Sequence, residues 1–404
     1  MARRPTKLPR AFIVAIGLSA ALLAQPGCTV TINGNGAAAG TTTSSATADQ
    51  SAQNKTGVLE LTSSVSKDEK YGLVKLSAGE DSFDFCGYAL GDSVDVAFSN
   101  GLKLTDVPYF NGYYVATGSP VVVAYPGFDY VAITYNNQGM WDQAGLSEGD
   151  TVTITLCEKG KYLSTQEALS QSYSSDREKY DSNEQFVNFR ALAGGRLKAN
   201  YLYRGASPVD NTHGRAAYAD GLLEAYGITC VIDLADSADE MQAYFAATGF
   251  DSPYVKSLYE QGHVVTLSMS SSYSSDVYKQ GVAAGMRHLL HGDGPTYIHC
   301  MEGKDRTGFA CMLVEALAGA SYDEMCADYM QTYANYYGIT KASKPQSYDA
   351  IVSLYFDAFI EYLTGAEDGQ ADKTADYSGA ARDYLLSTGM SDAEIDQLVA
   401  LICE

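Results

Sequence analysis

The residues that could do chemistry stand together between His299 and Thr307, where a cysteine and an arginine lie six positions apart. The five residues between Cys300 and Arg306 suffice for a tight loop whose backbone N–H groups curl around one oxyanion. Arg306 adds a fork of donors that suits two phosphate oxygens. The positive field of such a loop favours the thiolate form of Cys300 near neutral pH. The pattern therefore predicts phosphoryl transfer to sulfur.

The neighbouring sequence supplies the elements that would hold this loop. Residues 296–298 are β-formers that follow the breaker run Gly-Asp-Gly-Pro at 292–295, and they predict a buried strand. Residues 308–317 are an almost wholly apolar run of helix formers. We therefore expect a strand, a tight loop and a helix, with the loop at the carboxyl end of the strand, where open α/β sheets bind ligands.

Each residue of the stretch then has an expected role. Cys300 attacks phosphorus in line, a thiophosphate forms, and water cleaves it. Thr307 could donate its hydroxyl to the sulfur, and His299 could orient the loop through backbone contacts. Arg306 and the loop would hold the phosphate oxygens, and the loop residues are Met301, Glu302, Gly303, Lys304 and Asp305.

Two other interpretations compete with this one. A core cysteine beside a helix N-terminus could show the same Cys-x5-Arg spacing, but the flanking His, the Gly inside the loop and the Thr-Gly after Arg306 make the signal more specific. A nucleotide-binding loop requires Gly-x4-Gly-Lys-Ser/Thr. Here Ile298 stands where the first glycine should be, and Asp305 follows the lysine, which excludes the nucleotide interpretation.

The stretch resembles the signature loop of the cysteine-dependent tyrosine phosphatases. Its form His-Cys-x-x-Gly-Lys-Asp-Arg-Thr-Gly is similar to the bacterial atypical branch, the secreted tyrosine/lipid phosphatases of dual or triple specificity. Residues 188–190 with 202–207 resemble the opening of that branch. Residues 226–234 with Glu240 resemble its second strand and the helix that follows. The resemblance covers residues 186–404, about half of the chain.

This resemblance implies a metal-independent hydrolase of phosphate monoesters that needs no cofactor, with a phosphotyrosine protein as the leading substrate. In the family, a lysine at the position of Lys304 goes with activity on phosphoinositides as well. Glu302 departs from the small residue common there, and its charge would oppose a highly phosphorylated ring. Arg190 and Arg204 would either bind phosphate or pair with Asp233.

The leaving oxygen needs a proton, and the acid that supplies it is not evident. In the family an Asp follows a separate strand, but no Asp stands directly after the strand that we expect at 263–269. Asp305 resembles the loop Asp of the branch and is the first candidate, although it could instead hold the loop through backbone N–H groups. Asp276, at the expected start of a helix, is the alternative acid. Asp236 and Asp239 are further candidates.

The N-terminal residues predict export. The first ten hold four basic side chains and no acidic one, and the next fourteen are an apolar run too short to span a bilayer comfortably. Residues 1–27 therefore predict a signal peptide. Cys28 would be lipidated, as in a bacterial lipoprotein at the cell surface, with residues 28–56 as a low-complexity tether. The alternative is cleavage near Ala24 and free secretion, in which case no lipid anchor would hold the protein to a membrane.

Residues 57–160 predict a small β-rich domain, either a barrel or a sandwich. Short runs of β-formers alternate with Gly, Asn and Pro, and they lie at 58–61, 71–76, 94–98, 113–116, 121–125, 131–135 and 152–156. Cys86 and Cys157 both fall in this region, and export would permit a disulfide between them. Residues 161–185 predict a polar, helix-prone connector.

Residues 186–404 predict a phosphatase domain of the α/β class with a mostly parallel central sheet flanked by helices. The expected strands are 202–204, 228–234, 263–269 and 296–298. The expected helices are 214–226, 237–247, 276–291, 308–317, 322–337, 347–363, 381–387 and 392–402.

The formal net charge of −22 opposes binding to nucleic acid and to anionic membranes. The expected partner is therefore a phosphorylated protein or a phosphoinositide, bound by local focusing of positive charge. The sequence carries no signal for an oligomeric state.

A rival function is a pseudophosphatase that binds phosphorylated ligands at the cell surface, which the missing Asp after strand 263–269 supports. Intact Cys300 and Arg306 oppose it, because a binder has no need of the nucleophile. A metal-dependent phosphoesterase would need clustered ligands. His288 and His291 are three positions apart without an evident third ligand, so we expect no metal site.

Overall fold

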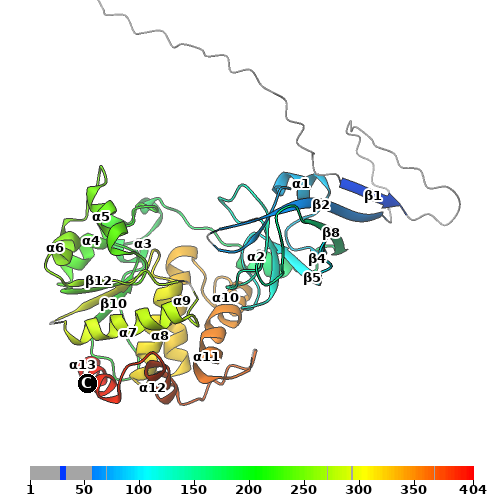
Figure 1. Ribbon diagram of the computed structural model, residues 1–404. Helices are drawn as coiled ribbons and strands as arrows, with labels where there is room; N and C mark the ends of the chain where they lie inside the picture. The colour runs from blue at the N-terminus through cyan, green and yellow to red at the C-terminus, as the bar shows by residue number, and fades with distance from the viewer. Residues whose placement is uncertain (1–27, 33–56, 70, 271, 293, 368) are drawn as a thin grey trace, which may run out of the picture.

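The computed structural model describes residues 28–32, 57–69, 71–270, 272–292, 294–367 and 369–404 (Figure 1). The predicted signal peptide at 1–27 and residues 33–56 of the predicted tether lie outside these ranges. Two sheets organise the described residues, one barrel-like and one with five strands. The α/β class predicted from the sequence is confirmed.

The barrel-like sheet closes on itself because β2 pairs with both β3 and β8, which decides between the barrel and the sandwich. In ring order its strands are β2 (Gly57–Lys67), β3 (Val74–Leu76), β7 (Ala132–Tyr135), β6 (Pro120–Val123), β5 (Lys103–Phe110), β4 (Ser93–Phe98) and β8 (Thr151–Glu158). Inward β-branched and aliphatic side chains such as Leu61, Val94 and Val152 are fully buried. Strand β1 (Cys28–Ile32) pairs with β2, with the backbone of Cys28 opposite Leu61.

Helix α1 (Glu80–Phe85) lies between β3 and β4 of the barrel. The short helices that join the barrel to the five-stranded sheet are α2 (Leu163–Leu169), the 3-10 turn η1 (Arg177–Lys179) and α3 (Asn183–Phe186). Helix α2 packs on α10 (Pro345–Ile351), as Figure 1 shows. The Lys344 ammonium, just before α10, donates to the Gln171 side-chain oxygen at 2.9 Å, so the connector contacts both parts of the chain.

The five-stranded sheet positions the candidate site. Its order is β12 (Val264–Thr266), β11 (Cys230–Asp233), β13 (Thr296–His299), β10 (Leu202–Gly205) and β9 (Arg190–Ala191). Strand β13 pairs in parallel with β10 and β11, and β11 pairs in parallel with β12. Strand β9 is antiparallel at the edge. The loop after β13 therefore leaves the middle of the sheet at the carboxyl ends of its neighbours.

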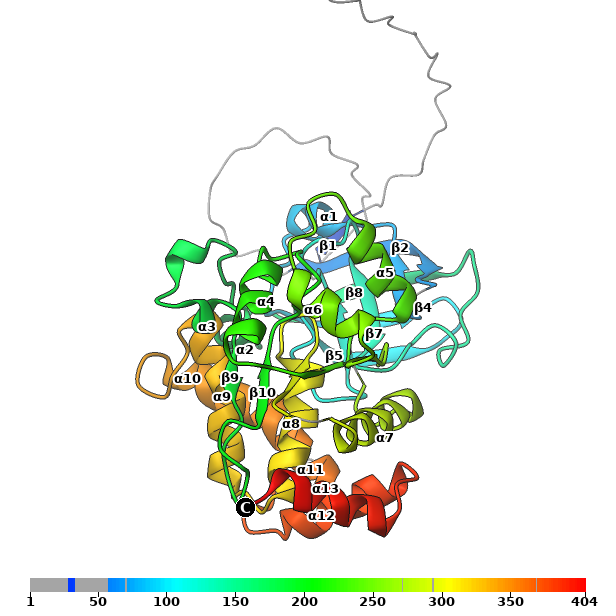
Figure 2. The same ribbon diagram turned by 90° about the vertical axis from the view of Figure 1, so that its left-hand side faces the viewer.

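Helices cover both faces of this sheet because side chains alternate along each strand. Val231 and Tyr297 face one layer, which holds α3, α4 (Ala216–Ala225), α5 (Ala238–Ala246) and α6 (Pro253–Glu260). Ile232 and Ile298 face the other. That layer contains α7 (Asp276–Leu290), α8 (Asp305–Leu317), α9 (Tyr322–Tyr337), the π-helical turn η2 (Val352–Phe356), α11 (Asp357–Thr364), α12 (Tyr377–Ser387) and α13 (Asp392–Ile402). Figure 2 shows the two layers on opposite sides of the strands.

Several sequence predictions were wrong in detail. The strand expected at 113–116 is absent from the described chain, and β5 occupies 103–110 instead. The strand expected at 263–269 spans only Val264–Thr266, because Ser268 takes a positive φ of 44° that ends the extended run. Cys157 is a free, exposed thiol, so the predicted bond with Cys86 does not exist.

Among the described residues, no helix has both the length and the apolar character that a bilayer span requires.

Candidate active site

The chain leaves β13 at His299, turns through residues 300–304 and enters α8 at Asp305, three residues before the apolar run at 308. The turn depends on Gly303, which has a positive φ of 66°. A Cβ at this position would lie 2.2 Å from the Gly205 carbonyl oxygen, so only glycine allows the loop to pack on the end of β10. The helix directs its positive end at the loop.

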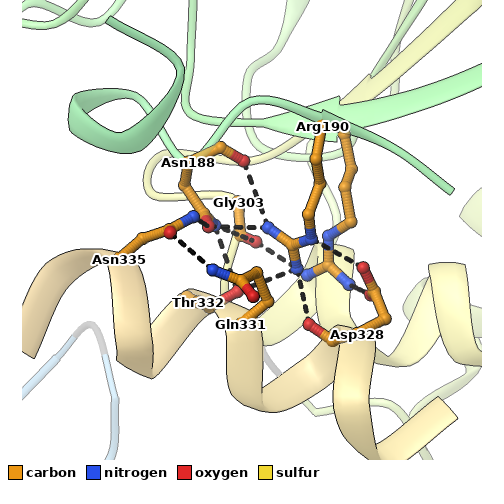
Figure 3. A network of polar contacts seen from close by, with 8 residues as sticks. Asn188, Arg190, Gly303, Asp328, Gln331, Thr332 and Asn335 are labelled. Atoms are coloured by element: carbon orange, nitrogen blue, oxygen red, sulfur yellow. Dashed lines mark hydrogen bonds and ion pairs between the residues drawn. The ribbon is translucent and has the colours of Figure 1, made fainter. Parts of the chain in front are cut away.

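Polar side chains hold the loop from behind (Figure 3). The Gly303 carbonyl oxygen accepts a hydrogen bond from Arg204 Nη2 at 2.8 Å and another from Asn188 Nδ2 at 3.2 Å. Arg204 and Arg190 in turn donate to the two carboxylate oxygens of Asp328 on α9, at 2.5 and 2.6 Å. The loop curvature is therefore fixed by a buried network that starts on neighbouring strands.

This network corrects the expectation for the two arginines. Both pair with Asp328 and not with Asp233, and the side chain of Arg204 is fully buried behind the loop. Burial opposes the charge of Asp328, but the two guanidinium groups hold its pKa below the usual range. Asp328 lies more than a hundred residues from either arginine, so no local sequence signal indicated the pairing.

The loop amides and Arg306 face the carboxyl edge of the sheet. Within the described contacts, the backbone N–H groups of residues 301–304 donate no hydrogen bond. An anion-binding nest requires N–H groups that are free in this way to bind the anion. Arg306 Nη1 lies 3.2 Å from the Met269 carbonyl oxygen and 3.5 Å from that of Ala235. The Tyr278 hydroxyl donates to the Arg306 carbonyl oxygen at 2.7 Å and fixes the first turn of α8.

Cys300 and its neighbours in sequence are buried. Cys300 is 3% exposed and follows β13 directly, while the Thr307 hydroxyl is buried without a hydrogen-bond partner among the described residues. Burial lowers the pKa of His299 to about 4, so its ring is neutral at pH 7. His299 Nδ1 lies 3.3 Å from the Cys300 carbonyl oxygen. His299 is therefore placed to orient the backbone and not to supply a positive charge.

The two charged side chains inside the loop pair with each other. Lys304 Nζ lies 3.2 Å from Glu302 and 3.9 Å from Asp305. Glu302 also accepts a hydrogen bond from the hydroxyl of Tyr173, which belongs to the connector. Burial opposes both charges, but Lys304 lowers the pKa of Glu302, and Asp305 together with Glu302 raises the pKa of Lys304 well above its usual range. The charge of Lys304 is thus neutralised within the protein.

The carboxylates considered as acids differ in position. Asp305 is the first residue of α8 and its side chain is 64% exposed. Asp276 lies in the first turn of α7 and is exposed, with Ser275 as the N-cap. Asp239 is exposed in the first turn of α5. Asp236, by contrast, is buried beside the loop.

Asp236 forms part of a buried acidic group together with Asp233. Burial and the neighbouring Asp233 raise the pKa of Asp236 to about 7, and burial raises that of Asp233 to about 6. The Asp236 main chain lies next to Ala235, whose carbonyl oxygen contacts Arg306. Two Asp residues three positions apart at the end of a buried strand were the available signal.

The arrangement can bind a tetrahedral oxyanion against a thiol. No group of three or more His, Cys, Asp or Glu side chains in the described ranges is arranged to hold a metal ion. Cys300 is followed within six residues by backbone N–H groups that donate no hydrogen bond within the described contacts, by the N-terminus of α8 and by Arg306, a set of groups suited to holding an oxyanion.

Known proteins share this region. The family described as the tyrosine phosphatase family matches residues 182–404. A Cupriavidus necator protein provisionally named a tyrosine-protein phosphatase is 28% identical over 170 residues, which make up 37% of this chain and 60% of that protein. The chain thus spans less than two thirds of this relative. A crystal structure of an uncharacterised conserved protein from Thermotoga maritima aligns over 23% of this chain and 35% of that protein's chain, at 19% sequence identity. The TM-score of 0.22 is too low to establish a shared fold.

Proposed function

Because this chain belongs to the tyrosine phosphatase family, we propose that it hydrolyses phosphate monoesters through a phosphocysteine intermediate on Cys300. The observation that supports the proposal is the 300–306 loop, in which Cys300 is followed by backbone N–H groups that donate no hydrogen bond within the described contacts and then by Arg306. The thiolate attacks phosphorus as the ester oxygen leaves with a proton, and water then cleaves the sulfur–phosphorus bond. Asp305, exposed at the start of α8, is the first candidate for this acid, and the buried Thr307 hydroxyl is the candidate donor to the sulfur.

The intermediate can be trapped directly. During turnover of an aryl phosphate, rapid quenching followed by mass spectrometry is expected to find one phosphoryl group on the peptide that contains Cys300. The same enzyme should be inhibited by vanadate and resist chelators. Hydrolysis without a phosphorylated cysteine would contradict the mechanism. Phosphate binding without hydrolysis would instead favour the pseudophosphatase.

The loop charges favour phosphotyrosine over phosphoinositides as the substrate. A second or third phosphate on an inositol ring needs an available cation, but the ammonium of Lys304 is paired with Glu302 at 3.2 Å and lies 3.4 Å from the Tyr337 hydroxyl. A phosphotyrosine side chain carries one phosphate, which Arg306 and the loop amides can hold. Aromatic side chains from the connector and α9, Tyr173 and Tyr337, add apolar surface near Glu302 and Lys304.

Glu302→Gln tests this preference. Removing the carboxylate frees the charge of Lys304, so the ratio of kcat/KM for an inositol polyphosphate over a phosphotyrosine peptide should rise about tenfold, since a charged hydrogen bond is worth roughly 1.5–3 kcal/mol. Glu178→Gln, an exposed change on η1, is the matched control. An unchanged ratio would show that Lys304 does not limit the choice of substrate.

A further inference from the structure

We propose that Asp236, paired with Asp233 at the carboxyl ends of the central strands, is the catalytic residue that protonates the leaving oxygen. The assignment rests on the proposed phosphatase function and changes the source of its proton. Asp305 and Asp276 are exposed at helix starts, whereas Asp236 is buried between the strand ends and the loop. A buried carboxyl can keep a proton at neutral pH and can deliver it without competition from water.

The local backbone brings the two carboxyl groups together. Asp233 is the last residue of β11, and its Oδ1 accepts hydrogen bonds from the N–H groups of Ala235 at 2.9 Å and of Asp236 at 3.1 Å. This tight turn folds Asp236 back over Asp233. The second carboxylate oxygen of each residue, Oδ2, is buried and has no hydrogen-bond partner among the described residues. Two adjacent buried carboxyl groups oppose each other's ionisation, so Asp236 keeps its proton to a higher pH than an exposed carboxyl group does.

The turn that carries Asp236 touches the phosphate-binding machinery. The Ala235 carbonyl oxygen, one residue before Asp236, lies 3.5 Å from Arg306 Nη1. The Leu234 N–H donates to the His299 carbonyl oxygen at 2.9 Å, which ties the same turn to the residue before Cys300. The turn that carries Asp236 is therefore held against the residues at both ends of the phosphate-binding loop.

Several titratable and charged groups lie near Asp236. They are Asp233 of β11, His299 of β13, Arg306 of α8, Asp210 of the loop after β10 and Tyr244 of α5. Burial comes first and Asp233 second in raising the pKa of Asp236 to about 7, with a smaller increase from Asp210. His299 acts in the opposite direction. The Tyr244 hydroxyl lies 3.4 Å from Asp236 Oδ1 and leaves Oδ2 for proton transfer.

The proton balance closes over one turnover. As the sulfur of Cys300 bonds to phosphorus and the phosphorus–oxygen bond breaks, the leaving oxygen takes the proton of Asp236. The resulting carboxylate then removes a proton from the water that attacks the phosphocysteine. The sulfur–phosphorus bond breaks, inorganic phosphate forms, and both the Cys300 thiolate and the Asp236 proton are restored.

Asp236→Asn, assayed in the full chain, tests the assignment with two esters. Phenyl phosphate has a poor leaving group that needs a proton, whereas 4-nitrophenyl phosphate releases a stable phenolate. The variant should lose about 100-fold in kcat on phenyl phosphate and much less on the nitrophenyl ester. In the wild type, kcat on phenyl phosphate should fall as the pH rises above about 7. This fall in the pH profile should be absent from the Asp236→Asn variant.

A stability measurement separates a catalytic from a structural role. The folded protein holds a proton on Asp236 that the unfolded chain releases, so stability falls as the pH rises from the unfolded value to about 7. Asparagine removes this penalty, and at pH 8 the variant should melt no lower than the wild type. A lower melting temperature at pH 8 would contradict the proton-holding role.

Matched variants decide between the candidate acids. Asp239→Asn, three residues away and exposed on α5, should hydrolyse both esters like the wild type. In an active enzyme, the assignment would be overturned if Asp236→Asn lost equal activity on both esters or lost none. It would also be overturned if Asp305→Asn lost activity on phenyl phosphate but not on the nitrophenyl ester. A wild type that hydrolyses neither ester would overturn the phosphatase function and this assignment with it.

Discussion

Replacing Cys300 by serine is expected to lower kcat on an aryl phosphate by about 100,000-fold, the order seen when an enzyme loses its nucleophile. A hydroxyl is far less ionised than a thiol near neutral pH and is a weaker nucleophile. The loop is held by Gly303 and by the network behind it, whose hydrogen bonds from Arg204 and Asn188 end on the Gly303 carbonyl oxygen. The serine variant should therefore still bind phosphate while failing to transfer it.

Two measurements check this result together. Turnover of 4-nitrophenyl phosphate reports catalysis, and protection against thermal unfolding by vanadate or phosphate reports binding. Cys157→Ser is the matched control, because Cys157 is a free thiol exposed on the barrel. Substantial turnover by Cys300→Ser would remove Cys300 from the mechanism. A loss of both binding and turnover would show instead that the loop had collapsed.

Replacing Asp328 by asparagine is expected to destabilise the five-stranded sheet and its helices by about 3–5 kcal/mol, because the fully buried Arg204 and the partly buried Arg190 lose their counter-charge. Such a loss is large beside the roughly 5–15 kcal/mol that stabilises a typical domain. Arg204 would then hold the Gly303 carbonyl oxygen less firmly, so phosphate affinity should fall as well. The effect on the site would act through the loop backbone and not through substrate contact.

The chain offers an internal control for this experiment. Its single tryptophan, Trp141, lies in the barrel core, so its fluorescence follows the barrel, while far-ultraviolet circular dichroism follows the helices. Asp328→Asn should lower the urea midpoint of the dichroism signal only. Asp396→Asn breaks an exposed ion pair with Arg382 and should leave that midpoint unchanged. Equal midpoints for Asp328→Asn and the wild type would mean that the network does not stabilise the fold.

Local signals predicted the helices well wherever both ends were marked. The expected helix at 322–337 matches α9, because Ser321 and Glu324 form a capping box and Gly338 ends the helix in a left-handed conformation. Helix α6 was missed, although Pro253 at its first turn was an available start signal. Its eight residues are too few for a helical pattern to stand out.

Contacts between distant residues were beyond sequence reasoning. The strand, loop and helix around Cys300 follow from local composition, and the structure places them as expected. The pairing of Arg204 with Asp328 depends on how α9 packs behind β10, which no short-range pattern encodes. Asp236 was ranked below Asp305 for the same reason, because burial decides which carboxyl keeps its proton.

The hydrogen bond between Tyr173 and Glu302 has a consequence for inhibitor design. A compound that only mimics phosphate would bind the loop alone. The loop lies within residues 182–404, the region that matches the tyrosine phosphatase family. Tyr173 precedes that region, and His213 lies 3.1 Å from its hydroxyl. A compound with a second arm directed over Glu302 toward these two rings would also contact Tyr173, which lies outside the region that the family match covers.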